Sequence, residues 1–202
     1  MIFGLVAGGI AALGYVINVW LLVTQPCDGK SLTPWIIWSV VGALLFKSYL
    51  TVGGSADETN DSAWVLMVYA IGPPTVLSIL FLHSKIRRSP FTRLDKLFLA
   101  ASVFSSVYLG CFNEGVLPLH INAAIDASGG VLLGRHVWRD PHSESLLVWS
   151  LFGLAGILNL FAVQSWSYMH GMYPVVLAAM TASLSVVIAI RRRGTPRPSH
   201  VS

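Results

Sequence analysis

The chain has 202 residues, of which 54% are hydrophobic and only 11% are charged, and its mean hydropathy is +0.69. This composition is typical of a polytopic membrane protein and excludes an ordinary soluble domain. The formal net charge of +4 comes from two basic clusters beside apolar segments, at residues 85–96 and 191–197, so it indicates membrane orientation and not nucleic-acid binding.

Seven apolar segments are long enough to cross a bilayer, which takes about 20 helical residues. The sequence therefore predicts an all-α membrane protein with seven transmembrane helices. The first segment has neither a basic start nor a small-residue cleavage site, so we expect a retained helix and not a signal peptide. The segments are residues 2–23, 32–52, 63–83, 94–112, 116–134, 146–163 and 172–190.

Lysine and arginine gather on one side of the predicted bundle. They occur in the connections after the first, third and fifth segments and in the C-terminal tail, whereas the other connections contain neither. Because basic connections stay in the cytoplasm, we expect the N-terminus outside and the C-terminus in the cytoplasm. Cys27 and Cys111 then lie on opposite sides of the membrane, where they cannot form a disulfide.

The second and sixth segments share a short motif. W-S-V-V-G begins at Trp38 and W-S-L-F-G begins at Trp149, each shortly after a polar connection that ends in Ser-Leu. This recurrence predicts two parallel three-helix repeats joined by a linker helix, a 3+1+3 layout. The expected divisions are residues 1–90 for the first repeat, 91–113 for the linker helix, 114–193 for the second repeat and 194–202 for a disordered cytoplasmic tail.

With these features the chain resembles the SWEET and PQ-loop transporters, which have the same layout and an external N-terminus. The stretch G-L-V-A-G-G-I-A-A-L-G-Y-V-I-N-V at residues 4–19 looks like the first helix of a half-size bacterial SWEET. The stretch G-R-H-V-W-R-D-P-H-S-E-S-L-L-V-W at 134–149 is similar to the family's basic loop before the sixth helix. The resemblance implies movement of a small polar solute, such as a sugar or an amino acid, by alternating access.

The sequence departs from this family at its hinge prolines. The family's proline-glutamine pair would fall on Ile17 and Asn18, and both residues differ. Helix kinks arise mostly at proline and glycine, so other positions would have to serve as hinges. The candidates are Gly72, Pro73, Pro74, Gly129, Gly130 and Pro174.

Asp126 is the residue around which we expect a site to form. It lies about ten residues inside the outer end of its segment, or roughly 15 Å deep at 1.5 Å per residue. A charged side chain at the bilayer centre costs about 2.5–3.5 kcal/mol on insertion scales, so it usually pairs with another group or lines a wet path. Asp126 could carry a proton or bind a cation, or it could only join two helices. The resemblance to proton-coupled PQ-loop carriers, which use an aspartate in the fifth helix, implies the proton role.

Other polar residues inside the apolar segments could complete this site. Lys47 is the natural partner of Asp126 in a pair that opens during transport, although its ammonium group could instead reach the outer interface. Buried asparagines need hydrogen-bond partners, which a polar solute or a neighbouring helix could supply. They are Asn18, Asn122 and Asn159.

Aromatic side chains at the repeated motif offer a further element of a site. Trp38 and Trp149 lie about one helical turn inside the cytoplasmic ends of their segments, where tryptophan often anchors a helix. Alternatively, their matching places would suit a stacking floor for a sugar or a flat solute. His120 lies near the outer mouth and could relay protons to Asp126.

Motifs for other functions are absent. The sequence has no H-E-x-x-H, phosphate loop or G-x-S-x-G, and its last segment lacks the lysine that a light-sensing Schiff base requires. His136, Asp140 and His142 surround Pro141, which breaks the helix that would align them on a metal. We therefore expect solvated loop residues here, no metal, no cofactor and no enzyme.

The expected function is a transporter in a lipid bilayer with a small polar solute as its ligand. The alternative is a non-transporting membrane protein, either a partner-binding subunit or a cargo receptor of similar fold. The two differ in whether Asp126, Asn159 and Lys47 line one cavity. The identity of the solute and the oligomeric state stay open, with a homo-oligomer among the options.

Overall fold

The computed structural model describes residues 2–24, 32–52, 63–83, 93–112, 115–164 and 166–195 of the chain. Within these ranges the protein is all-helical and contains no β-strand, so the predicted all-α class is confirmed for them. Five helices, α1, α2, α3, α5 and α7, are long and apolar enough to cross a membrane, which indicates a multi-pass membrane protein. The helices are α1 (Ile2–Thr24), α2 (Leu32–Val52), α3 (Ala63–His83), α4 (Arg93–Phe112), α5 (Val116–Arg139), α6 (Leu146–Leu160) and α7 (Tyr168–Gly194).

The later helices differ from prediction at their ends. α5 continues to Arg139 beyond the apolar run, because hydropathy marks the apolar part of a helix and not the end of its hydrogen bonds. α6 stops at Leu160, where the next two backbone N–H groups, of Phe161 and Ala162, bond to carbonyls three residues earlier and tighten the last turn. α7 begins early because the Ser167 hydroxyl caps it by accepting from the His170 N–H.

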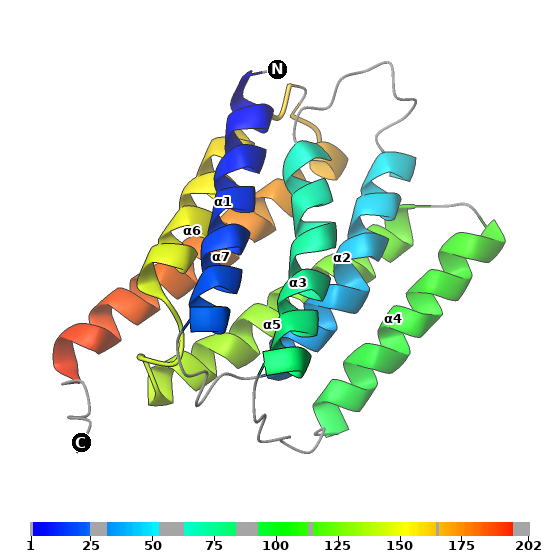
Figure 1. The fold of residues 1–202 in the computed structure, drawn as a ribbon. Helices are drawn as coiled ribbons and strands as arrows, with labels where there is room; N and C mark the ends of the chain where they lie inside the picture. Colours follow the sequence, from blue (N-terminus) through cyan, green and yellow to red (C-terminus); the bar gives the residue numbers. More distant parts are fainter. Residues whose placement is uncertain are drawn as a thin grey trace.

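The helix contacts follow one pattern twice. α3 packs against both α1 and α2, and α7 packs against both α5 and α6. The two sets meet where α1 packs on α6 and where α2 packs on α5. α4 lies at one edge of the bundle, against α2 and α5, and the start of α1 and the end of α7 lie at opposite ends of the bundle (Figure 1).

Glycines of the repeated motif allow close helix packing in both sets. A Cβ atom on Gly42 of α2 would lie 2.7 Å from the carbonyl oxygen of Tyr69 in α3. A Cβ atom on Gly153 of α6 would lie 3.3 Å from the Cα atom of Ala182 in α7. Small residues permit such approaches between membrane helices, so the motif glycine occupies a matching place in each set.

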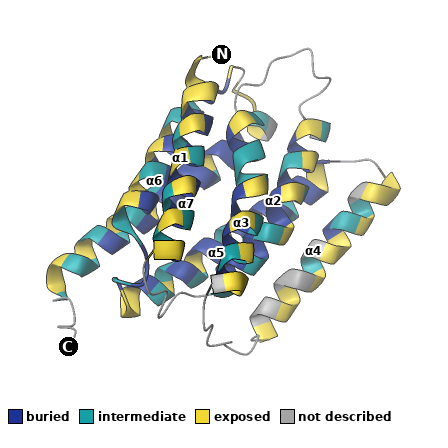
Figure 2. Ribbon diagram, in the orientation of Figure 1, coloured by how far each residue is buried: buried dark blue, intermediate teal, exposed yellow. Residues whose placement is uncertain are grey.

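Exposed residues lie along the outer sides of the helices (Figure 2), and many of them are large and hydrophobic. Val16, Trp20 and Leu82 are among the large hydrophobic residues exposed there, with exposed fractions of 65%, 61% and 77%. A soluble monomer rarely presents so much contiguous apolar surface, whereas lipid chains would cover it.

Several predictions concern residues that the structure does not describe. Cys27 lies outside the described ranges, as do five of the basic residues that predict membrane orientation: Lys30, Lys85, Arg87, Arg88 and Arg197. Of the predicted tail, Gly194 forms the last residue of α7 and residues 196–202 lie outside those ranges. Cys111 is exposed on α4.

Candidate functional site

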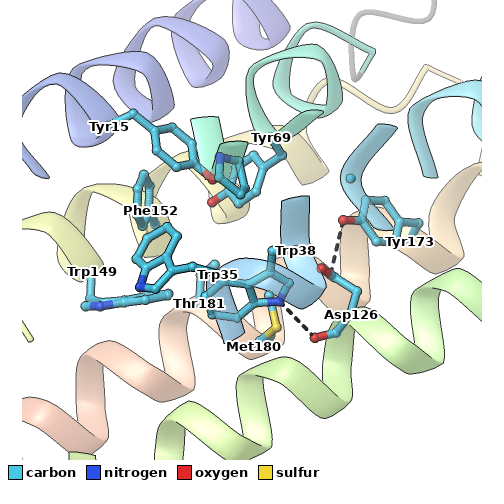
Figure 3. A pocket seen from close by; sticks show the side chains of 12 residues that line it. Tyr15, Trp35, Trp38, Tyr69, Asp126, Trp149, Phe152, Tyr173, Met180 and Thr181 are labelled. Carbon is cyan, nitrogen blue, oxygen red and sulfur yellow. Dashed lines mark hydrogen bonds between the residues drawn. The ribbon is translucent and has the colours of Figure 1, made fainter. Parts of the chain in front are cut away.

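A buried pocket lies where the two sets of helices meet (Figure 3). Its described lining residues come from six helices, α1, α2, α3, α5, α6 and α7. Most are aromatic, so the walls consist largely of ring faces and edges. These aromatic residues are Tyr15, Trp35, Trp38, Tyr69, Trp149, Phe152 and Tyr173.

Asp126 supplies the carboxylate of the pocket. Its side chain is 5% exposed, and its Oδ2 accepts a hydrogen bond of 3.2 Å from the Tyr173 hydroxyl. Its backbone carbonyl accepts a second bond of 3.2 Å from the Trp38 indole N–H. Two neighbouring helices, α7 and α2, therefore hold Asp126 of α5 at the pocket wall.

Gly129 permits the contact between Trp38 and Asp126. It lies almost one helical turn after Asp126, and a Cβ atom there would be 2.7 Å from the Trp38 Nε1 atom. Any larger residue would push the indole away from the Asp126 carbonyl. The neighbouring Gly130 similarly faces the side chain of Met180, a further lining residue. Both glycines lie within a continuous α5, where they make room for side chains of α2 and α7.

Trp38 and Trp149 meet at the pocket and are both buried, with their ring centroids 5.9 Å apart. Trp149 also packs edge-on against Phe152 at 5.4 Å, and Phe152 contacts the ring of Tyr15 at 4.7 Å. The tryptophans of the repeated motif thus begin a chain of ring contacts inside the bundle. Neither is positioned as an anchor at the membrane surface.

Glu144 fixes the orientation of Trp149, a role that the sequence did not predict. The Trp149 indole N–H donates to the Glu144 Oε2 atom at 3.2 Å, and Glu144 is 1% exposed. The Arg192 guanidinium of α7 donates to the Glu144 carbonyl at 2.6 Å and to the Pro141 carbonyl at 3.0 Å. The connection between α5 and α6 is therefore tied to the end of α7.

Lys47 does not lie beside Asp126 in the structure. It is an exposed residue of α2 and is not among the pocket-lining residues. Trp38, on the same helix, faces the pocket, and nine residues separate the two positions. At about 100° per residue this separation places them on opposite faces of the helix.

The three asparagines are buried but do not line the pocket. Asn122 lies one turn before Asp126 on α5, and Asn159 lies near the end of α6. The amide atoms of these two side chains have no hydrogen-bond partner among the described residues. Asn18 is buried on α1. The alternative functions were to be distinguished by whether Asp126, Asn159 and Lys47 line one cavity. Of these three residues, only Asp126 lines this pocket.

His120 lies nearer the start of α5 than Asp126 and does not line the pocket. Its Nδ1 atom is 2.7 Å from the Val116 carbonyl and must donate, because a carbonyl only accepts. In the neutral ring, Nε2 then accepts from the Tyr168 hydroxyl at 2.9 Å. His120 therefore joins the starts of α5 and α7 and makes no direct contact that would pass a proton to Asp126.

The predicted hinge prolines lie inside uninterrupted helices. Pro73 and Pro74 belong to α3 and Pro174 to α7. Pro73 lines the pocket, and Gly72 beside it has no room for a Cβ atom because that atom would overlap the Tyr15 ring. Gly72 thus makes room for the Tyr15 ring, and neither α3 nor α7 is interrupted at its prolines.

The tyrosines of the pocket were not predicted from the sequence. Tyr15, Tyr69 and Tyr173 lie in apolar segments, where each hydroxyl group needs a polar partner. A tyrosine deep in such a segment could have indicated a site, as the charged side chain of Asp126 did.

No protein-family model matches the chain, and comparison with curated proteins gives no match.

Proposed function

We propose that this protein is a membrane transporter that moves a small polar solute by alternating access between two three-helix bundles. In this proposal α1–α3 and α5–α7 are the bundles, α4 links them, and all seven helices cross the membrane. The observation that carries it is the buried pocket, which is walled by helices of both bundles and has one carboxylate among its described lining residues.

The helix contacts support the 3+1+3 layout. Replacing α1, α2 and α3 by α5, α6 and α7 converts each contact of the first set into a contact of the second. The same exchange converts the α1–α6 contact into the α5–α2 contact, as a twofold relation between parallel repeats requires. Gly42 and Gly153 add a matching residue in each half.

The size of the pocket fits a closed stage of such a cycle. The cavity volume is about 20 Å³, which holds roughly one water molecule. A sugar or an amino acid is larger, so the bundles would have to separate to admit it. Because the walls come from both bundles, movement of one bundle against the other would widen the pocket without unfolding a helix.

Asp126 would couple the solute or a proton to this movement. Its carboxylate accepts from Tyr173 of α7, and its backbone carbonyl accepts from Trp38 of α2, so it bonds to both bundles. Gain of a proton or of a bound cation would change the bond to Tyr173. The state of Asp126 would thereby influence how the bundles fit together.

The proposed orientation is N-terminus outside and C-terminus in the cytoplasm. Arg191 at the end of α7 donates to the Trp138 carbonyl at 3.1 Å, and its guanidinium lies 4.8 Å from the centre of the Trp138 ring. The ends of α5 and α7 therefore gather basic residues at one end of the bundle. The positive-inside rule assigns such an end to the cytoplasm.

Uptake into proteoliposomes tests the proposal. Purified protein would be reconstituted and supplied with labelled sugars, amino acids and amines, with and without an imposed pH gradient. A transporter moves at least one of these solutes, and Asp126→Asn lowers the rate about tenfold or more because a charge in the pocket is lost. The matched control is Asp140→Asn, which removes an exposed carboxylate and should leave uptake unchanged. If the wild-type protein moves no solute, a partner-binding subunit or receptor becomes the better interpretation.

A further inference from the structure

The charge of the pocket comes from one residue. Asp126 is the only carboxylate among the described lining residues, and none of them is lysine, arginine or histidine. The carboxylate accepts from the Tyr173 hydroxyl, which is a neutral donor. A buried carboxylate is normally offset by a cation, so an ionised Asp126 leaves this pocket with an unbalanced negative charge.

The remaining walls also favour positive charge. Aromatic rings carry a negative potential on their faces and attract a cation within about 6 Å of the ring centre. Asp126 and Tyr173 lie at one side of the pocket, and the rings of Tyr15 and Phe152 lie at the other (Figure 3). A ligand between them would meet a carboxylate at one side and aromatic rings at the other.

The other charge classes fit this lining less well. An anion would be repelled by Asp126 and by the ring faces, and a zwitterion would bring a carboxylate for which the described lining offers no cationic partner. A neutral solute such as a sugar would leave the charge of Asp126 unbalanced. Of these classes of solute, only a cation both balances the charge of an ionised Asp126 and interacts favourably with the rings.

We infer that the ligand of this pocket is a small organic cation, either an amine or a quaternary ammonium ion. The inference rests on the proposed function, because it names the class of solute that the transporter would carry. Trp35 and Tyr69 line the same pocket, and the Trp35 Nε1 atom and the Tyr69 hydroxyl are buried with no hydrogen-bond partner among the described residues. An indole N–H only donates, so an oxygen atom on the cation would give it an acceptor.

Choline is a suitable probe, since it combines a quaternary ammonium ion with a hydroxyl group. Binding of labelled choline to the full-length protein would be measured in nanodiscs of phosphatidylglycerol, whose headgroup carries no ammonium group. The uncharged competitor is 3,3-dimethyl-1-butanol, which has the shape of choline but a carbon in place of the nitrogen. We expect it to compete at least about tenfold more weakly than unlabelled choline, because it retains only the shape and the hydroxyl group.

Variants locate the binding to this pocket. Asp126→Asn should weaken choline binding about tenfold or more, and Asp126→Glu should retain most of it because the charge remains. Asp140→Asn removes an exposed carboxylate and should not change it. Size-exclusion chromatography would verify that each variant is folded. Equal competition by choline and its uncharged analogue, or unchanged binding in Asp126→Asn, would overturn the inference.

The outcomes separate this inference from the proposed function. Choline binding that depends on Asp126, without uptake into proteoliposomes, supports the cation site and contradicts the transporter. Uptake of a neutral solute that depends on Asp126, without choline binding, supports the transporter and contradicts the cation site. If neither binding nor uptake occurs, both are wrong.

Discussion

Replacing Gly129 by alanine tests how the pocket wall is built. The added Cβ atom would lie 2.7 Å from the Trp38 Nε1 atom and 3.1 Å from its Cε2 atom, so the indole must move. Movement breaks the bond from Trp38 to the Asp126 carbonyl, at a cost of about 0.5–1.5 kcal/mol. Overpacking adds about 1–3 kcal/mol.

Gly134→Ala is the matched control on the same helix. Its Cβ atom would make an ordinary contact of 3.6 Å with Leu184. Both substitutions improve helix propensity by about 0.5–1 kcal/mol, and this gain cancels in the comparison. The free energy of unfolding of Gly129→Ala should therefore lie about 1.5–4.5 kcal/mol below that of Gly134→Ala.

The assay is SDS-induced unfolding in mixed micelles, followed by far-UV circular dichroism. A double variant with Trp38→Phe adds a second measurement, because the smaller ring leaves room for the Cβ atom and the two effects should not add. Substitutions away from close contacts usually change the free energy of unfolding by less than about 0.5 kcal/mol. If the free energies of unfolding of Gly129→Ala and Gly134→Ala differ by no more than that, Trp38 does not pack on Gly129 as described.

Three further substitutions test other contacts in the same unfolding assay. Tyr173→Phe removes the bond to the Asp126 carboxylate and should lower the free energy of unfolding by about 0.5–2 kcal/mol; an unchanged value would contradict that bond. Gly42→Ala places a Cβ atom 2.7 Å from a backbone carbonyl of α3 and should destabilise by about 1–3 kcal/mol, whereas Gly9→Ala, with nothing within 4 Å, should not. Lys47→Met alters an exposed side chain, so stability should change by less than about 0.5 kcal/mol and uptake should persist; a loss of uptake would restore Lys47 to the site.

The sequence predicted some features because they depend on local chemistry. α2 and α3 have the predicted ends, since polar connections flank sharply bounded apolar runs. Asp126 was predicted because a carboxylate inside an apolar helix is costly unless it pairs with another group or lines a wet path. Trp38 and Trp149 were found through a motif, which gave their matching positions but not their contact.

Other features depend on which face a helix turns to its neighbours. Counting residues along a segment gives the depth of Lys47 but not its direction, and the angle from Trp38 places it on the opposite face. Tyr69 and Tyr173 reach the pocket only because α3 and α7 pack as they do. Such pairing between distant segments leaves no mark in the local sequence.

The distribution of tryptophan has an optical consequence. The chain has seven tryptophans; Trp35, Trp38 and Trp149 line the pocket, and the other four are exposed: Trp20, Trp64, Trp138 and Trp166. Brominated lipids quench indoles that they can reach, so they would quench those exposed indoles that lie within the bilayer and spare the three of the pocket. The native fluorescence thus divides into a part that reports the surrounding bilayer and a part that reports the interior, and neither requires an attached dye.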